Sequence, residues 1–259
     1  MQQAIDLLFI DKEHNKASSR TSIYQRDVYR IVESQEQVAT IGLVDNLDEQ
    51  FLLEQMLDQA KPTYRKNSAH LHYLLATPFR YPPLKHGSRF GSRMTPSFFY
   101  ASEEVETALA ECAYYRFLFL EGMKTPYLRT INSSYTLFSV FIDSVSAVDL
   151  TLLDEPFQTM LCLVDDYSFT QALGKKLLEK QVKVLRFNSA RTTSVLGDNI
   201  GVNVAITQPQ EIKSTAPQQC TTWLCSTTTE KVSFSSPKNP VISFDQKQFL
   251  VDGLFPSIL

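Results

Sequence analysis

The feature that most restricts the fold of this chain is the segment of residues 87–120, which contains three local patterns in succession. It begins as a glycine-interrupted loop with two arginines, continues as a short apolar run, and ends as a helical pattern with a glutamate near its middle. The residues that define these parts are Gly87, Arg89, Gly91, Arg93, Phe98, Phe99, Tyr100, Ser102 and Glu111. This order predicts that two guanidinium groups and one carboxylate lie on adjoining elements.

The helix is predicted by apolar residues that recur at three- and four-residue intervals and form one stripe. These residues are Val105, Ala108, Leu109, Cys112, Tyr115 and Phe119. We expect Ser102 to cap the N-terminus, and Glu103 suits the positive end of the helix dipole. At ~100° per residue, Glu111 lies at the edge of the stripe, where a carboxylate is partly dry but still reaches a cleft. A solvated glutamate paired with Arg116 is the alternative.

The arginine loop has the composition of an anion site. A planar guanidinium is suited to bidentate recognition of phosphate or carboxylate, which fits Arg89 and Arg93. Gly87 and Gly91 allow the backbone to approach a ligand closely, so that its N–H groups can hold an anion. The alternative is a surface turn with two solvated charges.

Several of these segments together resemble a known family. The run GSRFGSR…FFYAS…ETALAE is preceded by VYRIV and followed by LRFNSAR. In this order it resembles the RES domain, the toxin of bacterial toxin–antitoxin pairs. The resemblance implies an α+β fold like that of ADP-ribosyltransferases, in which split, mixed β-sheets with helices packed on them form a cleft for NAD. It also implies that NAD⁺ is a substrate, with no separate cofactor.

The resemblance assigns roles to individual residues. They are Glu111 and Arg30 as the catalytic residues and Arg93, Arg89, Tyr100 and Ser189 as the NAD-binding residues. Glu111 would stabilise the positive charge that develops on the ribose, and the arginines would hold the pyrophosphate. Arg89 competes with Arg93 for this role, because Met94 stands where many family members have tryptophan. Ser189 lacks a neighbouring histidine, so we expect it to bind or orient rather than attack.

The implied activity is degradation of NAD⁺ by cleavage of the nicotinamide N-glycosidic bond, by hydrolysis or phosphorolysis. A cognate antitoxin, Xre-like by family analogy, would neutralise the toxin. Two alternatives stay open. One is transfer of ADP-ribose to a protein, and the other is a non-enzymatic module whose arginine loop holds a nucleotide or a phosphorylated partner.

The remaining patterns divide the chain into three parts. Residues 1–26 are predicted to form an N-terminal arm, 27–206 the RES domain with a helical insertion near 46–60, and 207–259 a β-rich extension packed on the same domain. Strands are expected at 27–32, 135–142, 183–187 and 201–206, and a second helix at 166–180. His70 and His72 would share one face of a strand.

Composition excludes several classes of protein. A net charge of −3 argues against a generally basic nucleic-acid-binding surface. Because the chain lacks an apolar run of ~20 residues and a basic N-terminal leader, we expect a cytoplasmic protein outside the membrane. The four cysteines have no paired C-x-x-C spacing and are expected to be reduced and buried. His70 and His72 have no neighbouring ligands that would complete a metal site.

Overall fold

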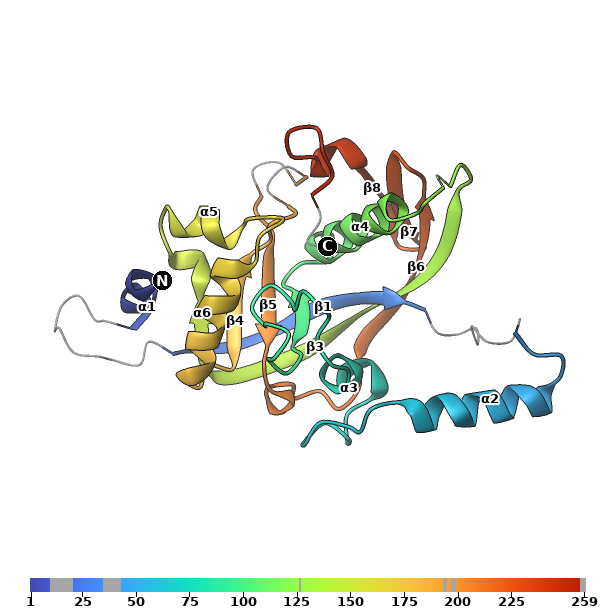
Figure 1. The fold of residues 1–259 in the computed structure, drawn as a ribbon, viewed down its shortest axis with the longest axis horizontal. Coiled ribbons are helices and arrows are strands. Elements are labelled where there is room, and N and C mark those ends of the chain that lie inside the picture. The colour runs from blue at the N-terminus through green and yellow to red at the C-terminus, as the bar shows by residue number, and fades with distance from the viewer. Residues whose placement is uncertain (10–20, 35–42, 126, 193–194, 197–198, 257–259) are drawn as a thin grey trace.

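One mixed sheet runs through the body of the protein in the computed structural model (Figure 1), which describes residues 1–9, 21–34, 43–125, 127–192, 195–196 and 199–256. Within these residues the strands are β1 (Ser22–Glu33), β2 (Phe99–Ser102), β3 (Ile131–Asp149), β4 (Val184–Asn188), β5 (Val202–Ile206), β6 (Gln218–Thr227), β7 (Lys231–Ser236) and β8 (Asn239–Asp245). Their order in the sheet is β1-β2-β5-β4-β3-β6-β7-β8, and β1 also pairs with β3. The predicted α+β class is confirmed.

Strand β3 joins the two parts of the sheet because it is 19 residues long. Along one edge it pairs with β1 in antiparallel register from Tyr135 to Ala147. Along the other edge its first half is antiparallel to β6 and its last residues are parallel to β4. Strand β2 pairs with both β1 and β5. Because β1 also pairs with β3, the strands β1, β2, β5, β4 and β3 form a closed ring. The sequence predicted split sheets. In the structure β3 connects the strands on its two edges into one sheet.

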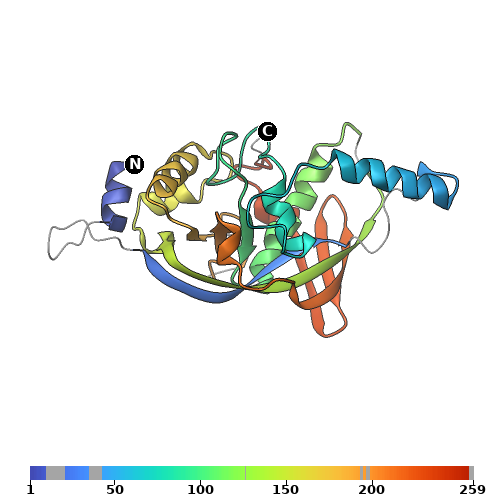
Figure 2. The same cartoon turned by 90° about the horizontal axis from the view of Figure 1, so that it is seen from below.

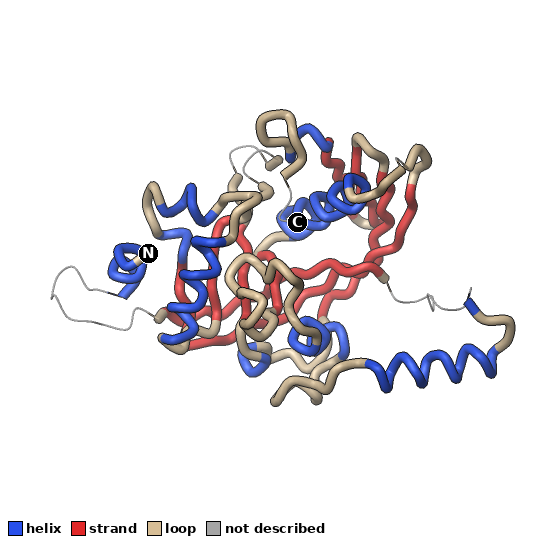
Figure 3. The backbone as a smooth tube through the Cα atoms, viewed as in Figure 1, coloured by secondary structure: helices blue, strands red, loops and turns tan. Residues whose placement is uncertain are grey.

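The helices lie around this sheet. They are α1 (Gln2–Phe9), α2 (Leu47–Ala60), α3 (Tyr73–Arg80), α4 (Val105–Glu121), α5 (Phe157–Leu161) and α6 (Ser168–Glu179), with short 3-10 turns η2 (Leu150–Leu152), η3 (Pro209–Glu211) and η4 (Gln246–Phe249). Figure 2 shows β1 and β3 as long curved strands along one side, with α1, α4 and α6 on the other. Figure 3 shows α2 projecting from the body at one end. Helix α4 packs against β6, β7 and β8 through one apolar cluster.

Two local predictions were wrong. His70 and His72 do not lie on a strand but precede helix α3, in which Leu75, Ala76 and Phe79 have helical spacing and are buried. His72 caps this helix, and its ring nitrogen accepts a hydrogen bond from the Leu74 N–H. Helix α4 has Glu104 as its N-cap residue instead of Ser102, which is the last residue of β2.

The predicted apolar stripe of α4 also included exposed residues and left out buried ones. Tyr115 and Phe119 are 55% and 53% exposed, whereas Tyr114 and Phe117 are almost fully buried. The helix is apolar on most of its circumference, so periodicity did not identify the face that packs on the sheet. The four thiols are free, but of the expected buried cysteines only Cys225 is buried, whereas Cys112 and Cys162 are half-buried and Cys220 is exposed.

The described residues of the predicted arm and of the predicted extension pack on the main body. Ala4, Ile5 and Leu8 of α1 are buried in the core that contains α5 and α6, and β1 begins at Ser22. Residues 10–20 of the arm lie outside the described part. The predicted insertion is α2, with Asn46 as its N-cap. The tail contributes β6, β7 and β8 to the common sheet.

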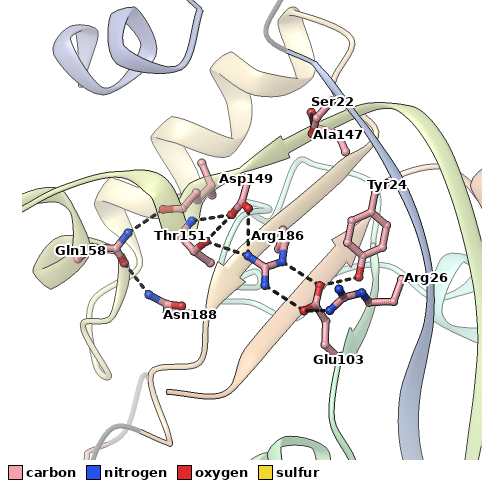
Figure 4. Close-up of polar contacts among 11 residues, drawn as sticks. Ser22, Tyr24, Arg26, Glu103, Ala147, Asp149, Thr151, Gln158, Arg186 and Asn188 are labelled. Atoms are coloured by element: carbon pink, nitrogen blue, oxygen red, sulfur yellow. Dashed lines mark hydrogen bonds and ion pairs between the residues drawn. The ribbon is translucent and has the colours of Figure 1, made fainter. Parts of the chain in front are cut away.

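A buried ion-pair network ties β1 and β4 to the residue that follows β2 (Figure 4). Glu103 accepts hydrogen bonds from Arg26 at 2.7 Å, from Arg186 at 2.9 and 3.0 Å, and from the Tyr24 hydroxyl at 2.9 Å. The carboxylate side chain is only 1% exposed. The hydrogen bonds that Arg186 donates to Glu103 raise the pKa of Arg186. Glu103 is therefore a structural anion, not a solvated residue of the helix N-terminus.

Gly174 allows α6 to lie directly on the arginine loop. A Cβ atom at this position would overlap the carbonyl oxygen of Phe90. We expect Gly174→Ala to lower the free energy of unfolding by about 1–3 kcal/mol, because the backbone must shift to relieve the overlap. The measurement is urea denaturation, with Gly122→Ala as the matched variant. Its added methyl group would meet its nearest neighbour at 3.5 Å, so equal destabilisation by both changes would contradict the explanation.

Candidate functional site

A cavity of about 1170 Å³ lies between α4, β1, β2 and the loop before β2. Its volume is above the roughly 300–1000 Å³ of typical small-molecule sites, so the cavity has room for a ligand larger than one nucleotide. Its described lining includes four arginines, Arg30, Arg89, Arg116 and Arg191, but only two glutamates, Glu33 and Glu111. This excess of guanidinium groups favours an anionic ligand.

Glu111 is held in the cavity wall by two hydrogen bonds to one oxygen. Its Oε1 accepts from the Ser189 hydroxyl at 2.7 Å and from the Asn203 side-chain amide at 2.6 Å. Asn203 is oriented in turn, because its carbonyl oxygen accepts from the Ser102 hydroxyl at 2.7 Å. Among the described residues, Oε2 of Glu111 accepts no hydrogen bond. The carboxylate is thus fixed in direction while one oxygen stays available.

Ser189 positions this carboxylate and does not line the cavity. The residue is fully buried at the end of β4, and its hydroxyl accepts a hydrogen bond from the Arg191 N–H at 3.2 Å while donating to Glu111. Its backbone N–H donates to the Gly201 carbonyl at 2.8 Å, which fixes the turn. A hydroxyl that already donates one hydrogen bond and accepts another is poorly placed to attack a substrate. Ser189 was predicted to bind NAD, but it is buried outside the cavity lining and its hydroxyl contacts Glu111.

Arg30 projects from β1 into the cavity wall. Its Nη1 donates to the Tyr100 carbonyl, and its guanidinium carbon lies 5.1 Å from the centre of the Phe99 ring. Its Nε is buried without a hydrogen-bond partner among the described residues. Burial lowers the pKa of Arg30 to about 10, so the side chain is still cationic at neutral pH. Arg30 and Glu111 line the same cavity.

The structure separates the two competing arginines of the loop. Arg89 is buried, lines the cavity, and donates from Nη1 to the carbonyl oxygens of Leu161 at 2.8 Å and Leu163 at 3.0 Å. Arg93 is exposed and is not among the lining residues. The two arginines are separated by a tight turn, in which Gly87 has a φ of +76° that favours glycine and the Ser88 N–H donates to the Gly91 carbonyl. The placement of Arg93 at the site is therefore corrected in favour of Arg89.

Tyr100 forms part of the cavity wall and fixes the arginine loop. Its hydroxyl is 2.9 Å from the Ser88 hydroxyl and accepts from the Phe90 N–H at 3.2 Å. Burial raises the pKa of Tyr100 to about 12, so the hydroxyl stays protonated. Its ring also lies edge-on to Phe187, with centroids 6.5 Å apart.

Sequence reasoning missed two groups beside these residues. Arg191 is 4% exposed, donates to the Val164 carbonyl at 3.0 Å, and lies with its guanidinium carbon 3.7 Å from the Tyr114 ring centre. It belongs to the LRFNSAR segment, but a turn was the simpler interpretation of that pattern. Asn203 lies on β5 in an apolar strand pattern. A buried polar residue in such a strand was the available signal.

No group of three or more His, Cys, Asp or Glu side chains in the described part of the chain is arranged to hold a metal ion. No helix in the same part is long and apolar enough to cross a membrane.

Comparison with known families agrees with the resemblance found in the sequence. Residues 62–224, more than half of the chain, match the family described as the RES domain. The chain belongs to the RES domain family. The matched part contains Arg89, Tyr100, Glu111 and Ser189, whereas Arg30 precedes it but lies in the same sheet.

Among solved structures, a chain of the M. tuberculosis MbcT–MbcA toxin–antitoxin complex is similar to this RES domain protein. The two sequences are 12% identical, the alignment covers 81% of this chain and 87% of the other, and the TM-score is 0.42. No curated protein matches the sequence.

Proposed function

We propose that this RES domain protein is a toxin that degrades NAD⁺ by cleaving the bond between nicotinamide and ribose. The observation that carries the proposal is the geometry of Glu111, whose carboxylate is fixed by Ser189 and Asn203 and lines an arginine-rich cavity. The family membership supports the same reaction, because the residues at this site are those through which the sequence resembles RES toxins.

The chemistry requires stabilisation of positive charge more than acid catalysis. When the bond between ribose C1′ and nicotinamide nitrogen breaks, the electron pair stays on nitrogen and nicotinamide leaves as a neutral molecule. The ribose becomes oxocarbenium-like, and an adjacent carboxylate stabilises that charge. Water or phosphate then forms the new bond at C1′, and an attacking water releases one proton to bulk solvent. The unengaged Oε2 of Glu111 is suited to face this centre.

The arginines would bind the other charged part of the substrate. Arg30 and Arg89 each use one nitrogen for a backbone carbonyl, which fixes the direction of the guanidinium group. Charge-assisted hydrogen bonds from their other nitrogens would hold the pyrophosphate. Tyr100 would then act by keeping the loop of Arg89 in place, in addition to any contact of its ring with nicotinamide.

The direct test is loss of NAD⁺ with purified protein, measured with and without inorganic phosphate. Formation of nicotinamide supports the proposal, and a dependence on phosphate identifies phosphorolysis. NAD⁺ with a labelled adenylate distinguishes transfer to protein, which leaves a labelled protein band. Binding of NAD⁺ without release of nicotinamide would refute cleavage and favour a non-enzymatic binding module.

Arg30→Ala is expected to lower kcat/KM for NAD⁺ by roughly tenfold or more, because a charge-assisted hydrogen bond contributes about 1.5–3 kcal/mol. The steady-state rate of nicotinamide release is the measurement. Arg93→Ala is the matched comparison, since this arginine is exposed and does not line the cavity. A larger loss in the Arg93 variant than in the Arg30 variant would contradict the assignment.

We further propose that a cognate antitoxin restrains the activity in the cell. Induced expression of the wild-type chain should stop bacterial growth, and co-expression of the product of an adjacent gene should restore it. If growth stops equally with the Glu111→Gln variant, the toxicity does not depend on this cavity.

A further inference from the structure

Two exposed aromatic side chains on α4 lie on the wall of the cavity in line with Glu111. Tyr115 and Phe119 follow Glu111 at intervals of four residues, which places all three side chains along one face of the helix. All three line the cavity. The rings are 55% and 53% exposed although both residues are large and aromatic. We call this pair the aromatic shelf.

The helix gives the distance between the carboxylate and each ring. With a rise of ~1.5 Å per residue, Tyr115 lies about 6 Å and Phe119 about 12 Å along the axis from Glu111. In a dinucleotide the second base is separated from the first ribose by a pyrophosphate and another ribose. If the first ribose lies at Glu111, the second base must lie about two helical turns away when the ligand is extended along α4.

Two other aromatic rings of the cavity lining, those of Tyr114 and Tyr167, are less available for stacking. Tyr114 and Tyr167 are 1% and 8% exposed, so neither ring offers a free face to a base. Tyr115 and Phe119 are instead more than half exposed, although the Tyr115 ring also packs edge-on against Tyr114, with centroids 5.3 Å apart. Stacking on an aromatic ring is the usual way in which proteins hold a base without recognising which base it is.

Arg116 supports the shelf from the same helix. Its guanidinium carbon lies 5.6 Å from the centre of the Phe119 ring, and its Nε donates to the Thr227 hydroxyl at 3.2 Å. Its Nη2 is buried without a hydrogen-bond partner among the described residues. A cation beside Phe119 orients the ring and adds positive charge next to the place where an adenosine phosphate would pass.

We propose that the aromatic shelf of Tyr115 and Phe119 binds the adenine ring of the dinucleotide. The inference rests on the proposed function, because it takes the nicotinamide ribose to lie at Glu111. It adds a basis for substrate selection: the cavity would prefer NAD⁺ to nicotinamide mononucleotide, which has the same scissile bond but no adenine.

The test compares these two substrates in Tyr115→Leu, Phe119→Leu and the double variant. We expect kcat/KM for NAD⁺ to fall roughly tenfold for each ring removed, the range of base–aromatic stacking. The value for nicotinamide mononucleotide should be unchanged. Phe51→Leu on α2 is the matched control, because this ring is 66% exposed and lies outside the cavity lining. It should leave both substrates unaffected.

Equal losses for the two substrates would overturn the proposal, since the rings would then support the helix rather than adenine. Unchanged NAD⁺ kinetics in the double variant would overturn it as well. Titration of ADP into wild-type and double-variant protein by calorimetry separates this inference from the proposed function. If the wild type cleaves neither substrate, the proposed function fails, and weaker ADP binding in the double variant still supports the shelf. Equal ADP affinity refutes it.

Discussion

Glu111→Gln is expected to reduce the rate of NAD⁺ cleavage by roughly 10²-fold or more, because the substitution removes the negative charge that faces the developing cation. The amide is nearly isosteric with the carboxylate. Its oxygen can still accept hydrogen bonds from Ser189 and Asn203, which both go to Oε1 in the wild type. The variant therefore tests charge with little change in packing.

The measurement is single-turnover release of nicotinamide, together with the melting temperature and the affinity for NAD⁺. We expect the chemical step to slow while melting temperature and affinity stay close to those of the wild type. Glu106→Gln is the control, since this residue lies on the same helix and is exposed. Unaltered turnover in the Glu111 variant would remove this carboxylate from the mechanism.

Glu103→Ala is expected to destabilise the fold by about 3–5 kcal/mol, the range for removing one partner of a buried ion pair. Arg186 is bound through two nitrogens to Glu103, and its side chain is only 25% exposed, so its charge would lose its main partner. Tyr24 would also lose the acceptor of its buried hydroxyl. For a chain of this size, the expected fall in melting temperature is roughly 6–20 °C.

Thermal and urea denaturation of the Glu103 variant measure this effect. Glu106→Ala provides the comparison, because it removes the same charge from an exposed position and should change stability by less than about 0.5 kcal/mol. Similar stabilities for the two variants would mean that the network in Figure 4 contributes little net free energy. A fall in NAD⁺ cleavage without any loss of stability would instead point to a direct role in the site.

The loop before β2 shows where local pattern is informative and where it is not. The glycines and arginines predicted an anion-binding loop, and one arginine does reach the cavity. Which one it is depends on the direction in which the chain leaves the turn at Gly87, where φ is +76°. The motif shows that both arginines are present in the loop, but it does not predict the backbone angle at Gly87. Arg89 and Arg93 therefore remained equivalent until the backbone was placed.

Contacts over long sequence separations were the least predictable. Glu111 bonds to residues 78 and 92 positions away, and Glu103 to residues 77 and 83 positions away. These contacts exist because β1, β2, β4 and β5 are neighbours in the sheet. The positions of Arg191 and Asn203 in the site depend on the same strand order, which no local periodicity encodes.

The sequence by itself determined the elements that carry the chemistry. The spacing of apolar residues placed the main strands and the helix of Glu111, since backbone hydrogen bonding and side-chain burial act over a few residues. Only the tertiary structure decided that Arg89 faces inward, that Ser189 holds Glu111, and that Tyr115 and Phe119 remain exposed. Those outcomes depend on which surfaces cover each element, and that is set by the packing of segments distant along the chain.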